Sequence, residues 1–223
     1  MFPRVSLLAL LAANLVPLIG VLFFAWDLIL VLALFWIENI IIGIFNLLKM
    51  LAVAARTRQI NGVFLSVFFV LHYGLFCSAH GQLLSKLLGV APLVLDASAQ
   101  ATQTGPFNLF IDAANLCLYF IDSYSPVILL AILGLVLSHL VSLIENFILK
   151  GGMFNQSVNK LMGKPYKQIL IMHAGLMLGA IALQKFGSSI WLLAVLVGLK
   201  MVVDFHLHKR RHKPANPELI KDL

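Results

Sequence analysis

Four ionisable side chains stand inside long apolar stretches of this sequence: Glu38, His72, His139 and His173. An ionisable side chain at the depth of a lipid bilayer costs at least about 2.5–3.5 kcal/mol on insertion scales, so it normally faces other helices and marks a functional site. Neutral imidazoles and a carboxylate are sufficient ligands for zinc or iron. We therefore predict that these four side chains converge near the middle of the membrane and bind a metal ion.

We expect further polar residues to surround the metal site or to form a polar path through the bundle: Asn39, Asn46, His80, Ser142, Glu145 and Asn146. Residues three, four or seven apart share one side of a helix. This spacing predicts one polar stripe from Glu38 and Asn39 to Lys49. It predicts two more, one that joins His72 to His80 and one that joins His139 to Asn146.

The same residues fit three other functions. Two histidines on facing helices are the minimum for holding a haem. A chain of groups that titrate near neutrality is enough to relay protons. The stripes also suit a polar path in a transporter or channel component, whose repeated units move about it. Alternatively, the polar residues only hydrogen-bond helices together in a structural assembly subunit.

The composition requires helices that lie in lipid. The chain has 223 residues, 61% hydrophobic and 11% charged, against roughly 45–50% apolar and 25% charged in soluble domains. Because lipid cannot satisfy backbone amides, apolar runs of about 20 residues must be helical. We predict an all-α, six-transmembrane-helix bundle in one domain over about residues 1–208, with a basic tail at 209–223. The expected helices are about 5–25, 28–54, 62–88, 125–149, 167–186 and 189–207.

Basic residues set the expected orientation. Lysines and arginines cluster before the first helix, after the second, between the fourth and fifth, and in the tail. All four clusters fall on one side of the membrane, which predicts that both termini are cytoplasmic. The net charge of +7 therefore indicates orientation, not nucleic-acid binding. We expect the tail at Lys209–Lys213 to bind anionic lipid of the inner leaflet.

The loop at about 89–124 contains an apolar stretch from Phe107 to Tyr124 that polar residues interrupt. It predicts a helix lying at the outer membrane interface, with a re-entrant hairpin as the alternative.

Gly175 and Gly179 form a G-x-x-x-G spacing, which permits close helix packing or a homodimer. Cys77 and Cys117 have no paired spacing, so the sequence predicts neither a CxxC metal site nor a redox motif.

A short pattern occurs twice. Ile37–Asn39 and Ile144–Asn146 both read I-E-N, while His72–Leu75 and His173–Leu176 both read H-x-G-L. In the expected topology the two helical hairpins run in parallel. The pattern predicts two copies related by an axis along the membrane normal, as in some transporters.

The string Phe35-Trp36-Ile37-Glu38-Asn39, which continues to Lys49-Met50, together with His72-Tyr73-Gly74 and His80-Gly81, resembles a family of small bacterial inner-membrane proteins of unknown function. The resemblance covers nearly the whole chain and implies a six-helix membrane protein without supplying an activity. His173-Ala174-Gly175 is also similar to the last catalytic helix of rhomboid intramembrane proteases. The serine motif of those proteases is missing, so nucleophilic proteolysis has no support.

Overall fold

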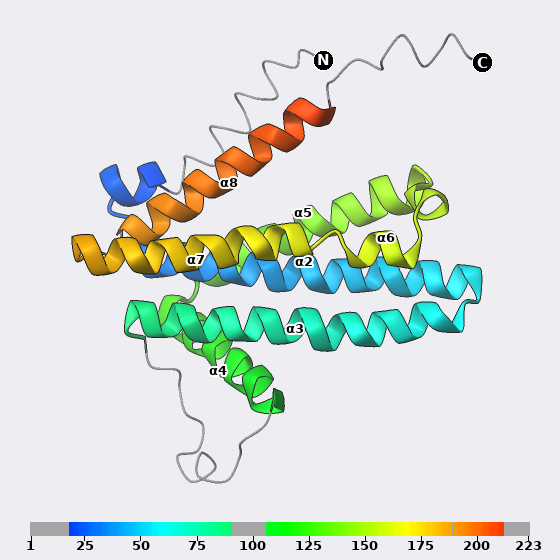
Figure 1. Ribbon diagram of the computed structural model, residues 1–223, viewed down its shortest axis with the longest axis horizontal. Coiled ribbons are helices and arrows are strands. Elements are labelled where there is room, and N and C mark those ends of the chain that lie inside the picture. The colour runs from blue at the N-terminus through cyan, green and yellow to red at the C-terminus, as the bar shows by residue number, and fades with distance from the viewer. Residues whose placement is uncertain (1–17, 91–105, 189, 212–223) are drawn as a thin grey trace.

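Long helices make up the computed structural model of the chain, which describes residues 18–90, 106–188 and 190–211 (Figure 1). A helical segment at 18–23 is followed by α2 (Leu28–Thr57), α3 (Ile60–Leu88), α4 (Pro106–Tyr124), α5 (Val127–Ser142), α6 (Val158–Met162), α7 (Tyr166–Phe186) and α8 (Ile190–Arg211). A π-helix at Leu143–Leu149 continues α5, and a 3-10 turn at Gly152–Asn155 precedes α6. With helices throughout and no strand in the described residues, the all-α fold class is confirmed.

Four helical segments of the described chain are long and apolar enough to cross a membrane: Leu28–Thr57, Ile60–Leu88, Val127–Leu149 and Val158–Phe186. They indicate a membrane-embedded protein. The expected first helix, 5–25, lies largely outside the described residues, and the apolar part of α8, Ile190–Leu199, is shorter than a span. A total of six spans therefore stays a prediction. The side chains of the basic tail at Lys209–Lys213 also lie outside what the structure describes.

Capping residues define where α2 and α3 begin and end, and a left-handed residue between the two helices allows a tight hairpin. The Asp27 carboxylate accepts hydrogen bonds from the backbone amides of Ile29 and Leu30, at 2.7 Å and 3.2 Å. These bonds satisfy amides that have no partner within the first turn of α2. Arg58 ends α2 in the left-handed conformation, with φ of 52°, and α3 begins two residues later. Gly89, with φ of 66°, ends α3.

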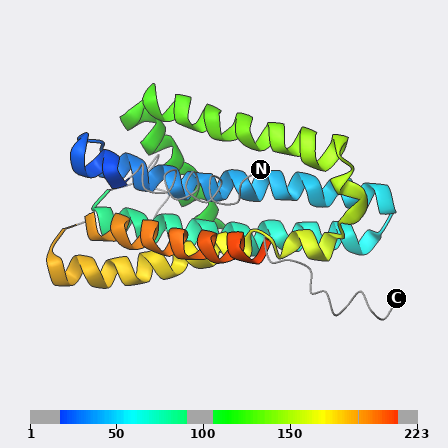
Figure 2. The same ribbon diagram turned by 90° about the horizontal axis from the view of Figure 1, so that it is seen from above.

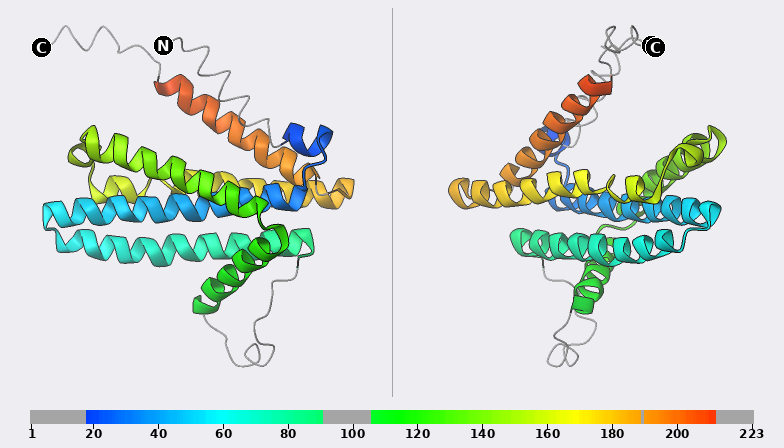
Figure 3. Two further views of the ribbon diagram at one scale, coloured as in Figure 1. Left: turned by 180° about the vertical axis from the view of Figure 1, so that it is seen from behind. Right: turned by 45° about the vertical axis from the view of Figure 1, so that its right-hand side comes forward.

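Helix α2 is the centre of the bundle. Seen from above, it lies between α5 on one side and α7 with α8 on the other (Figure 2). It also packs against α3 and α4. Helix α4 runs at a steep angle to α2 and α3 (Figure 3). The fully buried Trp36 of α2 meets Phe120 of α4 edge to face, with ring centroids 6.4 Å apart. Because α2 has neighbours on several sides, its polar residues are divided among different interfaces.

Candidate functional site

Glu38 and Asn39 of α2 face different neighbours. With 3.6 residues per turn, consecutive side chains on a helix diverge by about 100°. Glu38 lines a cleft of about 650 Å³ between α2 and α5, together with Asp27 and Ser138. Asn39 is buried, and its Nδ2 donates to the Met172 sulfur of α7 at 3.2 Å. The single polar stripe expected on α2 is therefore two separate faces.

The buried asparagines of α2 connect helices. Asn46 Nδ2 donates to the main-chain carbonyl of Leu161 in α6 at 3.1 Å. The backbone oxygen of Asn39 accepts a 3.0 Å hydrogen bond from the Tyr73 hydroxyl of α3. Asn39 and Asn46 are seven residues apart, so they share the face of α2 that meets α3, α6 and α7. They lie on the side of α2 away from the Glu38 cleft rather than around Glu38.

His72 of α3 pairs with a residue that the sequence analysis did not single out. Its Nδ1 lies 2.7 Å from the Tyr166 hydroxyl at the start of α7. Glu38 lines the cleft between α2 and α5 instead. A meeting of Glu38 and His72 therefore stays a prediction. Tyr166 lies only one position before the expected start of its helix, a place where sequence patterns define boundaries poorly.

His80 and His173 form the second contact between α3 and α7. His80 Nε2 lies 3.0 Å from His173 Nδ1, and His80 Nδ1 lies 2.6 Å from the carbonyl oxygen of Phe76. A carbonyl only accepts, so His80 Nδ1 carries a hydrogen and its neutral Nε2 is an acceptor. His173 Nδ1 must then donate to it, which leaves the lone pair of His173 on Nε2. The hydrogen bonds thus determine the tautomers of both rings.

The two contacts have matching spacing along parallel helices. His72 and His80 are eight residues apart, or about 12 Å, while Tyr166 and His173 are seven apart, or about 10 Å. Aromatic rings continue between them on α3: neighbouring centroids of Phe68, His72, Phe76 and His80 are 5.1, 5.1 and 6.2 Å apart. We call the pairs Tyr166–His72 and His173–His80 the two rungs.

The remaining predicted residues lie along α5 and its π-helical continuation. His139 stacks on Phe45 of α2, with ring centroids 5.6 Å apart, and interacts electrostatically with Glu38 and Lys49. Toward the end of the helix, Asn146 contacts Ser142 and Lys150, and Glu145 forms an ion pair with Lys150. The Glu145 side chain is 52% exposed. Ser142, Glu145 and Asn146 therefore do not surround a buried centre.

No three His, Cys, Asp or Glu side chains of the described chain lie close enough together to hold a metal ion. Glu38, His72, His139 and His173 consequently do not converge on one centre. The reason is their placement: α5 carries His139 on one side of α2, while α3 and α7 bring His72 and His173 to another (Figure 2). The polar residues form pairs, and the closest histidine pair is His80–His173.

The chain was compared with known proteins. The match is to the "Family of unknown function (DUF6498)", over residues 1–220. The chain belongs to this family. No curated protein and no solved structure matches it. The resemblance to an uncharacterised family is thereby confirmed, and the function of this DUF6498 protein has to be argued from its own residues.

In this DUF6498 protein, Gly175 and Gly179 pack against α8 of the same chain. Both glycines are buried, and a Cβ added to them would collide with Leu196 and Leu192 respectively. The repeated H-x-G-L pattern places Gly74 in a comparable position, where an added Cβ would lie 2.5 Å from Phe110 of α4. The G-x-x-x-G spacing is thus used inside one chain. The duplication itself stays a prediction. Its two halves differ in burial, since Asn39 is buried whereas its counterpart Asn146 is exposed.

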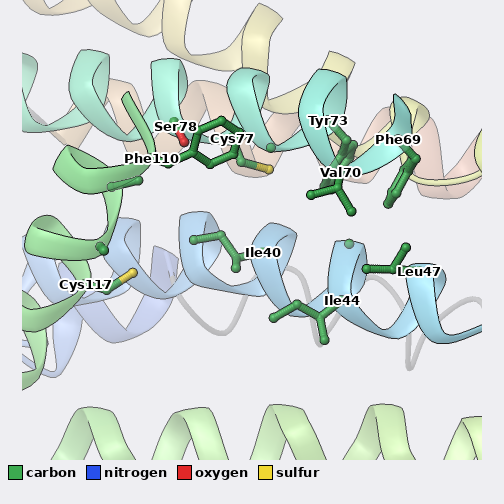
Figure 4. A pocket seen from close by; sticks show the side chains of 14 residues that line it. Ile40, Ile44, Leu47, Phe69, Val70, Tyr73, Cys77, Ser78, Phe110 and Cys117 are labelled. Atoms are coloured by element: carbon green, nitrogen blue, oxygen red, sulfur yellow. The ribbon is translucent and has the colours of Figure 1, made fainter. Parts of the chain in front are cut away.

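Both cysteines of this DUF6498 protein line one apolar cavity of about 300 Å³ between α2, α3 and α4 (Figure 4). Glycines and alanines on the three helices leave the space, and Ile40, Ile44 and Phe110 form part of its wall. Burial raises the pKa of the Cys117 thiol, on α4, to about 11. At neutral pH this cysteine is therefore a protonated thiol rather than a nucleophile.

Proposed function

We propose that this membrane protein is a proton relay in which His80 and His173 hold and exchange a proton between α3 and α7. The observation that carries the proposal is the 3.0 Å contact between His80 Nε2 and His173 Nδ1. Imidazole titrates closer to neutrality than any other unperturbed side chain, which suits it to this exchange. Ionisable residues at membrane depth typically mark such relays.

The tautomers define one transfer step. His173 is exposed on the bundle surface, and its Nε2 lone pair accepts the incoming proton. The hydrogen on His173 Nδ1 then moves to His80 Nε2, so that His173 becomes neutral and buried His80 becomes the imidazolium. His80 keeps its other hydrogen on Nδ1, which donates it to the carbonyl oxygen of Phe76, and this hydrogen bond stabilises the charged ring. One proton enters the pair and one positive charge moves inward.

The surrounding groups extend this interface. The rung Tyr166–His72 lies about 12 Å along α3 from His80, and Cys77 lies one turn before His80 on α3. Both rungs join α3 to α7, whereas Cys77 faces the cavity between α2, α3 and α4. A metal centre has no comparable support, because the described residues offer no cluster of three ligands. A purely structural role would require only the hydrogen bonds, not the basic nitrogen of His173.

Proton flux into liposomes tests the proposal. The full-length purified protein is reconstituted with an internal pH-sensitive dye, and a potassium diffusion potential drives protons inward. We expect flux above that of protein-free liposomes. His173→Asn should abolish this flux, since its amide keeps a donor at the Nδ1 position but removes the basic Nε2. His139→Asn, on the α5 face, is the matched control and should retain the flux.

Three outcomes would overturn the proposal. The first is wild-type protein with no flux above protein-free liposomes, and the second is full flux through His173→Asn. The third is stoichiometric zinc or iron in the purified protein that is lost in Glu38→Ala, which would favour the metal site instead. Nitrogen NMR of labelled histidine adds a direct check, since a hydrogen on Nε2 of neutral His80 would contradict the assigned tautomer.

A further inference from the structure

Asn39 has one amide atom that the protein leaves without a partner. Its Nδ2 donates to the carbonyl oxygen of Phe35 at 2.8 Å and to the Met172 sulfur at 3.2 Å. These two bonds use the NH₂ group, so Oδ1 must act as the acceptor. Oδ1 is buried and has no hydrogen-bond partner among the described residues. The Asn39 residue as a whole is 4% exposed.

An unpaired buried acceptor of this kind is costly. Leaving one without a partner costs about 1–3 kcal/mol, and the great majority of buried polar atoms in proteins are satisfied by protein or ordered water. In a membrane-embedded bundle, surrounding lipid cannot supply the missing hydrogen bond. The partner of Asn39 Oδ1 must therefore come from a molecule held inside the bundle.

Asn39 also lines a small pocket. It has a volume of about 30 Å³ and is lined by Phe35, Asn39, Gln168, Ile171, Met172 and Leu196, where α2, α7 and α8 meet. A water molecule needs roughly 10–15 Å³ of such space and two to four polar partners. The Gln168 amide offers both a donor and an acceptor. The space is large enough for one water.

We propose that this cavity holds one ordered water, which donates to Asn39 Oδ1 and hydrogen-bonds the Gln168 amide. The water links the central helix α2 to α7 through two side chains from different helices. This inference goes beyond the proposed proton relay and does not depend on it, because it rests on Asn39 and Gln168 rather than on either rung. Buried waters of this type are structural parts of a fold.

X-ray footprinting in ¹⁸O-labelled water tests the site. Radiolysis of a bound water generates hydroxyl radical beside the nearest side chains, and methionine sulfur takes up the label as sulfoxide. Met172 is the reporter because its sulfur contacts Asn39. Met50 is an internal control: it is also buried, with 0% of its surface exposed against 5% for Met172, and its sulfur lies 3.4 Å from Nδ2 of Asn46. Mass spectrometry then gives the labelling rate of each methionine in the full-length protein.

We expect Met172 to be labelled several-fold faster than Met50 in wild-type protein. Asn39→Leu removes the acceptor and fills space, so it should lower the Met172 rate to that of Met50. Gln168→Leu should do the same from the other wall, which keeps the test available if Asn39→Leu does not fold. Equal wild-type rates for the two methionines would overturn the proposal. So would a Met172 rate that neither substitution changes in a folded variant.

Discussion

The indole Nε1 of Trp36 donates a 2.8 Å hydrogen bond to the main-chain carbonyl oxygen of Cys77. One turn further along α3, Gly81 leaves room for the same ring: a Cβ at this position would lie 2.5 Å from Cζ2 of Trp36. Trp36 is fully buried. The separation of α2 and α3 therefore depends on the Trp36 ring and on the absence of a side chain at Gly81. The position of His80, which lies beside Gly81 on α3, depends on the same packing.

Gly81→Ala should destabilise the protein by forcing α2 and α3 apart. Overpacking of this kind typically costs about 1–3 kcal/mol, which a lower thermal unfolding midpoint in detergent would reveal. Gly134→Ala in α5 is the matched control, because a Cβ there meets nothing within 4 Å. Alanine favours helix over glycine by about 1 kcal/mol, so the control should keep or raise the midpoint. An unchanged midpoint in Gly81→Ala would contradict the close approach.

Gly179→Ala should loosen α8 from α7, since the added Cβ collides with the Leu192 side chain. Leu192→Ala alone leaves a cavity and should cost about 2–5 kcal/mol. The double variant removes the collision with the Leu192 Cδ1 atom and leaves only a tight 3.0 Å approach to its Cα, so its loss of stability should be smaller than the sum of the two single losses. Thermal unfolding of the four proteins measures this coupling. Strict additivity would show that Gly179 does not contact Leu192.

The contact between Tyr124 and Asp27, outside the spanning helices, should make the stability of the protein depend on pH. Burial, and then the nearby Asp27 carboxylate, raise the pKa of Tyr124 from 10.0 to about 12. The folded state thus holds this proton more tightly than the unfolded state. Its contribution to stability is complete below pH 10 and is lost as the pH rises through about 12.

Absorbance at alkaline pH checks this value, as the difference between wild type and Tyr124→Phe. Asp27→Asn should lower the Tyr124 pKa while still capping α2, because asparagine caps helices about as well as aspartate. The drop in stability above pH 10 should be smaller in Tyr124→Phe than in wild type. A Tyr124 titration centred at pH 10 in the folded protein would refute the assignment.

Cys117 should react slowly with iodoacetamide. Its pKa of about 11 leaves roughly one thiolate in a thousand at pH 8, a few hundredfold less than in an ordinary thiol with a pKa of about 8.5. Cys77→Ala leaves Cys117 as the single cysteine, and mass spectrometry follows its alkylation. Ser123→Cys, introduced after both native cysteines are replaced, places a thiol at an exposed position of the same helix. Equal alkylation rates at the two positions would rule out a buried Cys117 thiol.

Local features of the sequence were sufficient to predict several elements. The apolar runs predicted helices close to the observed α2, α3, α5 and α7, because a backbone in lipid has to satisfy its hydrogen bonds within each segment. The eight-residue spacing of His72 and His80 correctly placed both imidazoles on one side of α3. These features depend only on residues close together in the chain.

The tertiary structure decided which neighbouring helix each helix face contacts. Helical periodicity says which residues share a side, but lipid is as apolar as leucine, so an apolar side facing lipid reads like one facing another helix. The sequence therefore did not reveal that Glu38 faces α5 while Asn39 faces α7. It also did not reveal that His80 meets His173. Those contacts join residues more than ninety positions apart, and only the packing of α2 between its neighbours brings them together.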